Sequence, residues 1–98
     1  MSDDGQRTYR CVPTIAWVKD AGQTLLVEEE AGRTWSLRGV EAAVWDWLSL
    51  GYSFDEIVGL LKVLVGASDE EARERLVAML EGWKQAGIVR LAGSNGRG

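Results

Sequence analysis

Residues that could perform chemistry are few in this chain. Cys11 is the only cysteine and the sequence contains no histidine, which excludes an intrachain disulfide and a Cys/His zinc site. The usual pairings of a nucleophile with a general base are missing as well. Two acidic runs, Glu28–Glu30 and Asp69–Glu71, are explained by a solvated turn and a helix start, with no convergent partner for a metal. We therefore predict a protein that is not an enzyme and has no metal or cofactor site.

The residues that could instead bind a ligand run from Arg33 to Leu48, where an alternating strand turns into an amphipathic helix. Trp35 and Leu37 point to one face of the strand, because side chains alternate along an extended backbone. From Val40 onward the apolar residues recur every three or four positions, which is the spacing of a helix. A strand that leads directly into a helix forms a corner. We interpret this corner as one wall of a peptide-binding groove.

Composition restricts the partners. The chain has 98 residues, enough for one domain with a modest core, and a formal net charge of −4. Nucleic acid and anionic membranes are poor partners for such a chain, because phosphate binding needs a concentrated positive face. No apolar run reaches transmembrane length, and residues 1–10 lack the hydrophobic region of a signal peptide. We expect a cytoplasmic protein.

The first half of the chain predicts three strands. The first covers Tyr9–Lys19 and is entered through Pro13, which cannot donate to a strand ladder. The second covers Gln23–Glu29 and the third Arg33–Leu37. The short turns between them, rich in Gly, Asp and Glu, predict an antiparallel meander.

The second half predicts three helices. The first spans Val40–Leu50, and capping boxes at Ser53–Glu56 and Ser68–Glu71 open the other two. Gly51, Gly66 and Gly87 follow the three predicted helix ends, where a left-handed backbone favours glycine. The inward stripes are predicted to be Phe54, Ile57, Val58, Leu61 and Leu64 on the second helix, and Ala72, Leu76, Leu80 and Trp83 on the third.

The predicted class is therefore α+β, a three-stranded antiparallel meander followed by a three-helix bundle, similar to a winged helix. Residues 9–91 form the single domain. Residues 1–8 are predicted to be a disordered N-terminus and residues 92–98 a flexible tail. Within the domain, Ile88–Leu91 is either a short final strand or an extended segment.

The five tryptophans belong mainly to the predicted core. Trp45 and Trp47 point about 160° apart on an ideal helix, so one stripe cannot centre both. One of them is expected at the edge of a groove or in a second contact.

One flank of the third helix also favours peptide binding. Arg73, Val77 and Lys84 lie beside its inward stripe and offer an apolar centre between two cations, suitable for an acidic, amphipathic peptide. The alternative is a solvated face, on which long basic side chains cover apolar neighbours.

The spaced hydrophobic residues and glycines form a pattern made of Leu25, Leu26, Gly32–Leu37, Ala42–Trp45, Leu48, Gly51, Ser53, Ile57, Leu80, Gly87 and Ile88. With this pattern the chain resembles the PqqD family, small peptide chaperones of pyrroloquinoline quinone biosynthesis. It also resembles the wider group of precursor-recognition domains of ribosomally synthesised, post-translationally modified peptides (RiPPs), including those of lasso-peptide clusters. Many members carry Asn and then Thr or Ser between the third strand and the first helix. Here Arg38, Gly39 and Val40 occupy that place, so the first helix must be capped differently.

The resemblance implies that the leader region of a precursor peptide binds as an added strand beside the third strand, against the third helix. An edge strand has unpaired N–H and C=O groups that such a peptide satisfies. The predicted peptide-binding residues are Arg33, Thr34, Trp35, Ser36, Leu37, Arg38, Arg73, Val77, Leu80 and Lys84. The family also implies a partner enzyme, such as a radical SAM, cyclising or protease enzyme, to which the held leader is presented.

Two other functions stay open at this stage. A winged-helix DNA-binding module has a related topology, but the second helix has a net charge of −1 and the third helix, with five acids and three bases, a net charge of −2. A non-catalytic structural or oligomeric partner is the other alternative, because a free sheet edge permits it. The sequence leaves open the precursor, its modification, the partner enzyme, the subfamily and the oligomeric state.

Overall fold

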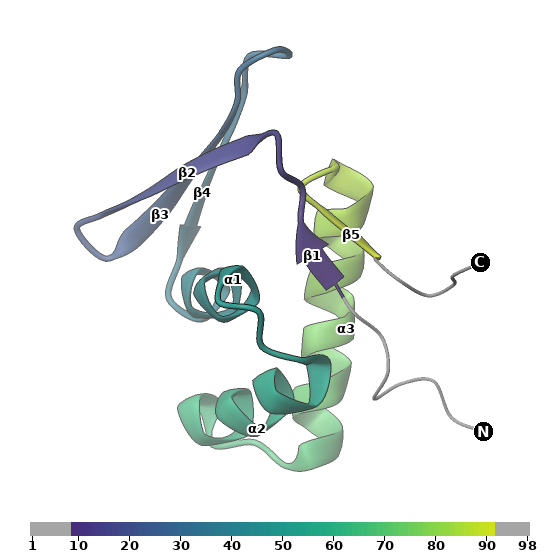
Figure 1. Cartoon of the computed structure of the whole chain (residues 1–98). Helices are drawn as coiled ribbons and strands as arrows, with labels where there is room; N and C mark the ends of the chain where they lie inside the picture. Colours follow the sequence, from purple (N-terminus) through teal and green to yellow (C-terminus); the bar gives the residue numbers. More distant parts are fainter. Residues whose placement is uncertain (1–8, 92–98) are drawn as a thin grey trace.

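A computed structural model describes residues 9–91, and the predicted disordered N-terminus and flexible tail lie outside them. A small sheet lies above three helices, and two further short strands lie in front of the third helix (Figure 1). The elements in chain order are β1 (Tyr9–Cys11), β2 (Ile15–Asp20), β3 (Gln23–Glu28), β4 (Arg33–Arg38), α1 (Val40–Ser49), α2 (Phe54–Val65), α3 (Asp69–Ala86) and β5 (Val89–Leu91). The predicted α+β class with a three-stranded meander and three helices is confirmed.

The first predicted strand is wrong in one respect, because the structure divides it at Pro13 into β1 and β2. The N–H of Ile15 donates to the carbonyl of Val12 at 3.0 Å, which closes a turn around the proline. β1 leaves the meander and pairs antiparallel with β5, while β2, β3 and β4 form the three-stranded sheet. The predicted segment Ile88–Leu91 thus contains a short strand, β5 (Val89–Leu91), as one of the two predicted alternatives had it.

The helix ends agree with their sequence signals. Both capping boxes are present: the Ser53 and Ser68 hydroxyls each accept the backbone N–H three residues later at 3.1 Å. Gly87 ends α3 with a φ of 87°, in the left-handed region. α1 begins differently, since its N-cap is Gly39 with a φ of 57° and no side chain caps it. This agrees with the departure from the family pattern at residues 38–40.

The core lies where α1, α2 and α3 meet the inner face of the sheet. The predicted inward stripe of α3 is fully buried. The predicted stripe of α2 is wrong at one position, because Leu64 is 51% exposed while the other four members are buried. Leu64 lies in the last turn of α2, which ends at Val65, beyond the buried members of the stripe.

Three tryptophans from three elements pack edge-on against one another in a row. Trp45 of α1 is fully buried and packs edge-on against Trp17 of β2, with ring centroids 6.4 Å apart, and against Trp83 of α3 at 5.8 Å. Trp47 is only half-buried, so it is the one of the predicted pair that lies at the edge of the core. Trp17 is 39% exposed and is not a core residue.

The capping boxes give a direct test of the helix starts. Replacing Ser53 or Ser68 with Ala should lower the free energy of unfolding by about 1 kcal/mol each, because an early backbone N–H loses its acceptor. Chemical denaturation of the purified variants measures this. Ser49→Ala is the matched control, since that exposed hydroxyl only donates to the Asp46 carbonyl at the end of α1. An equal loss in the control would contradict the assignment.

Candidate peptide-binding site

β4 is an edge strand of the meander. Within residues 9–91 it pairs only with β3, from Glu28 opposite Arg33 to Gln23 opposite Arg38. The other long side of its backbone has no strand partner in this part of the chain. Such an edge exposes a row of N–H and C=O groups that an extended peptide can pair with.

The β2–β3 turn determines which backbone groups of β4 face outward. Its two loop residues, Ala21 and Gly22, have φ of 51° and 82°, the values of a type I′ hairpin turn, in which the flanking residues are hydrogen-bonded. Bonded and non-bonded pairs then alternate along the strands. Following this alternation through β3 leaves the N–H and C=O groups of Thr34, Ser36 and Arg38 pointing away from the sheet. These three residues define the open edge.

Arg33 lies at one end of the open edge, and its side chain makes contacts within the sheet. Its guanidinium bonds Glu28 on β3 through Nε at 2.8 Å and Nη2 at 2.6 Å, and its centre lies 4.9 Å from the Trp35 ring centroid. A Cβ added to Gly87 would lie 3.3 Å from the Nη2 of Arg33. The start of β4 therefore lies beside the C-terminus of α3, where the helix dipole favours a cation.

The other predicted residues of β4 divide by face. Thr34, Ser36 and Arg38 are exposed on the outer face of the sheet, and the Ser36 hydroxyl donates to Gln23 at 2.6 Å. On the inner face Trp35 is half-buried, while Leu37 is only 4% exposed. Trp35 is thus the inward side chain of β4 that combines apolar surface with access.

Side-chain contacts of the predicted α3 flank run to α2 and β1. Arg73 bonds Asp69 at 2.9 Å and Asp55 at 3.0 Å, and its guanidinium lies 5.9 Å from the Phe54 ring centroid at the start of α2. Further along the same side, Glu81 accepts from Tyr9 of β1. Hydrogen bonding to Arg73 lowers the pKa of the Asp69 carboxyl. These contacts place this flank toward β1 and the start of α2.

Val77 and Lys84 lie on that same flank. Val77 is half-buried and lines a mainly apolar hollow of about 450 Å³ together with Glu70, Arg73, Glu74 and Ala78. Lys84 pairs with Glu81 at 3.3 Å. Leu80, the last predicted member, is 1% exposed and belongs to the core.

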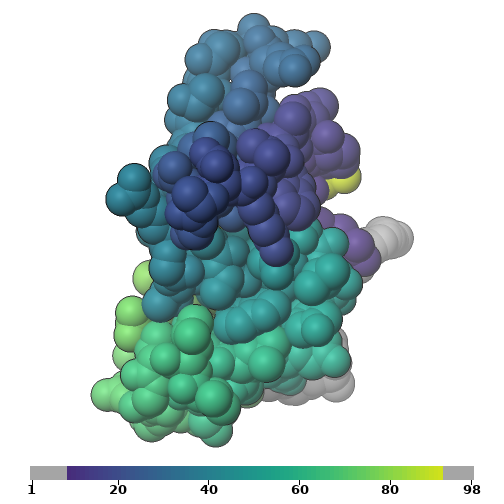
Figure 2. Space-filling view, turned by 90° about the vertical axis from the view of Figure 1, so that its left-hand side faces the viewer, coloured from purple at the N-terminus to yellow at the C-terminus, as the bar shows by residue number. Residues whose placement is uncertain are grey.

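Arg75 and Met79 occupy the opposite flank of α3. β4 and a part of α3 lie on one side of the molecule and β5 on the other (Figure 2). Arg75 is exposed and Met79 is half-buried against the core. Arg73 and Arg75 are two residues apart, which is about 200° around the helix. The sequence contained no signal to choose between the two flanks, because both have a cation beside an apolar residue.

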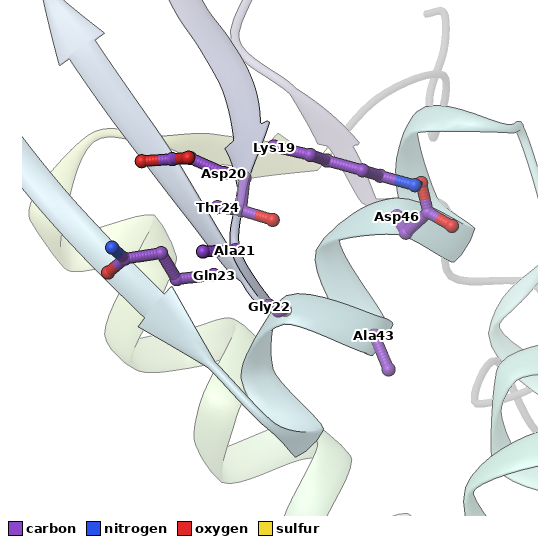
Figure 3. Close-up of a pocket in the computed structure, with 9 residues that line it drawn as sticks. Lys19, Asp20, Ala21, Gly22, Gln23, Thr24, Ala43 and Asp46 are labelled. Atoms are coloured by element: carbon purple, nitrogen blue, oxygen red, sulfur yellow. The ribbon is translucent and has the colours of Figure 1, made fainter.

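The other edge of the sheet, β2, is protected. Pro13 lies two residues before it, and Lys19 on its inner face pairs with Asp46 of α1 at 2.9 Å. Figure 3 shows this ion pair across a pocket between the β2–β3 turn and α1, floored by Ala42 and Ala43. Prolines and inward-pointing lysines are devices that prevent pairing at an edge strand.

Among residues 9–91, no three His, Cys, Asp or Glu side chains converge to hold a metal ion. Burial raises the pKa of the Cys11 thiol to about 11, so the thiolate nucleophile is scarce at neutral pH. Nor does this part of the chain contain a helix that is both long and apolar enough to cross a membrane.

Comparison with known proteins decides the family. The family described as coenzyme PQQ synthesis protein D (PqqD) matches residues 23–89. The chain belongs to the PqqD family. This region holds β3, β4 and all three helices, so the PqqD match includes the open edge and both flanks of α3. A search of curated proteins found no match.

Two solved structures share the fold of this PqqD family member. TbiB1 in complex with the TbiA(beta) leader peptide has a TM-score of 0.77 and 17% identity, over 86% of this chain and 95% of that chain. A lasso peptide synthetase B1 complexed with the leader peptide has a TM-score of 0.77 and 19% identity, over 85% of this chain and 98% of that chain.

The state of Cys11 can be tested by alkylation. At about pH 8 the folded thiol should carry about 100-fold less thiolate than an unfolded one, because its pKa lies about two units higher. Iodoacetamide labelling, followed by intact mass, should therefore be slow in buffer and fast in denaturant. Equal rates in the two conditions would show that Cys11 is a reactive thiol and would reopen nucleophilic chemistry.

Proposed function

We propose that this protein binds the leader region of a ribosomal precursor peptide by adding it as a strand to β4, and presents it to a modifying enzyme. The observation that carries the proposal is the open edge, whose three outward backbone positions lie beside the half-buried Trp35. Membership of the PqqD family supports it. So does the shared fold with two proteins whose structures contain leader peptides.

The choice of β4 over β2 follows from how each edge is built. β2 has Pro13 before it and the Lys19–Asp46 pair along it, whereas β4 has neither device. β4 and a part of α3 lie on the same side of the molecule (Figure 2), and the Arg73 flank contacts α2 and β1. We therefore take the flank of Arg75 and Met79 as the one nearer to β4. An added strand therefore gains backbone hydrogen bonds on one side and side-chain contacts with α3 on the other.

The bound segment should be apolar with an acidic residue. Trp35 and Met79 are half-buried and supply apolar surface, while Arg75 and Arg38 are exposed cations. Arg33 is already paired with Glu28. The protein itself is proposed to catalyse nothing, its only cysteine having a raised pKa. DNA binding is disfavoured, because α2 and α3 are both acidic and would meet phosphate repulsion.

Strand addition predicts a specific effect of proline. Ser36→Pro removes an outward N–H without removing a backbone hydrogen bond to β3, so leader binding should fall by about tenfold or more while the fold persists. Ser36→Ala and Thr34→Ala should change affinity by less than about twofold, because backbone groups make the bonds. Fluorescence anisotropy with the leader of the precursor encoded beside this chain measures both.

Lys19→Pro is the matched control, since by the same alternation its N–H points outward from β2. It should leave the affinity unchanged. Circular dichroism and a thermal transition must show both proline variants folded. Undiminished binding by a folded Ser36→Pro variant would refute addition to β4, and a loss in Lys19→Pro alone would move the peptide to β2.

The flank of α3 used by the leader is a separate prediction. Arg75→Glu should weaken binding by about three- to tenfold at low salt, because exposed charge pairs are worth about 0.2–1 kcal/mol and reversal adds repulsion. Lys84→Glu makes the same change in net charge on the same helix and should have little effect. The reverse order of effects would restore the flank of Arg73, Val77 and Lys84 predicted from the sequence.

A further inference from the structure

α2 has more apolar surface than its core contacts use. Eight of its twelve residues are apolar, yet only Phe54, Ile57, Val58 and Leu61 are buried. Val63 is 84% exposed, Leu64 51% and Leu60 37%. These three residues, here called the apolar ridge, lie three and four positions apart and so share one side of the helix.

The apolar residues of α2 extend beyond the stripe that a helix needs to pack on one side. At twelve residues α2 is too short to cross a membrane, and no helix among residues 9–91 meets that requirement. Adjacent exposed apolar side chains of this kind mark interaction sites when polar residues surround them. The apolar ridge therefore indicates a partner that covers α2 from outside.

The surroundings of the ridge specify the partner's charge. Residues 53–71, which contain α2 and the first turn of α3, hold five acids and one base, and the remainder of the chain holds ten of each. This segment thus accounts for the whole net charge of −4. Lys62, its single base, pairs with Asp69 at 3.7 Å, and Arg73 of α3 pairs with Asp55 and Asp69. The segment together with Arg73 still has a net charge of −3. An apolar surface with an acidic border is complementary to an apolar surface with a basic border.

A second copy of this chain does not fit the ridge. A two-fold dimer places the same patch of both subunits in contact, which would bring two segments of charge −4 together. The ridge also lies apart from the open edge: α2 is at the opposite end of the molecule from the sheet (Figure 1). A protein seated on α2 therefore leaves β4 accessible.

We infer that the apolar ridge is the docking surface for the peptide-modifying enzyme, through a patch of apolar residues bordered by Lys and Arg. The inference rests on the proposed function, since a carrier gains from binding its leader and its enzyme at once. Two separate surfaces allow this simultaneous binding and convert capture of the leader into an effectively intramolecular step.

The test uses the double variant Val63→Gln/Leu64→Gln in the full chain. Glutamine removes apolar area, keeps the charge and is a good helix former. The probe is the purified peptide-modifying enzyme encoded beside this chain, titrated by calorimetry. We expect the enzyme affinity to fall by about tenfold or more. Leader affinity should stay within about twofold of the parent protein.

Val18→Thr is the matched control, since Val18 is a 57% exposed apolar residue on the sheet. It should leave both affinities unchanged. Enzyme affinity that survives the double variant, or a parent protein that binds leader but not enzyme, would overturn the docking surface and leave leader binding intact. Failure of the parent protein to bind leader would instead overturn the proposed function. Sedimentation velocity of the chain alone should give a monomer, and a dimer that the double variant dissolves would assign the ridge to self-association.

Discussion

The edge-on packing of Trp45 between Trp17 and Trp83 is the contact on which the arrangement of the molecule depends. The meander reaches the helices chiefly through α1, and Trp45 is the fully buried centre of that junction. Among residues 9–91, the indole Nε1 of Trp45 is buried and has no hydrogen-bond partner. The face of an aromatic ring can accept such an N–H group weakly. By joining β2, α1 and α3, this row of tryptophans fixes how β4 lies relative to α3.

The core contacts α3 along one stripe, so the two flanks of the helix make different contacts. One flank is occupied by internal contacts, in which Arg73 joins two carboxylates and Phe54 while Glu81 bonds Tyr9. The other flank, with Arg75 and Met79, has an exposed cation and a half-buried apolar side chain. The acidic segment around α2 lies at a third place. Three surfaces of different chemistry thus surround one small core.

Local signals predicted local structure well. The capping boxes at Ser53 and Ser68 specify helix starts because the bonds they make span only three residues. Pro13 also gave a correct signal of interruption, but only the structure shows that the chain leaves the sheet there to pair with β5. The flank of α3 that faces β4 depends on how the helix is rotated in the assembled core. No spacing within the helix encodes that rotation, so the sequence could not distinguish the two flanks of α3.

The alternation of side chains along β4 also restricts the register of a strand added to it. Side chains of an added strand point in turn toward α3 and toward the outer face of the sheet, because both strands have a period of two residues. A peptide that slips by one residue along Thr34, Ser36 and Arg38 exchanges its two sets of side chains, whereas a slip by two keeps them. The burial of Leu37 and the partial burial of Trp35 fix the register of β4 within its own sheet. The alternation that folds β4 would therefore also determine which side chains of an added strand face α3 and which face away from it.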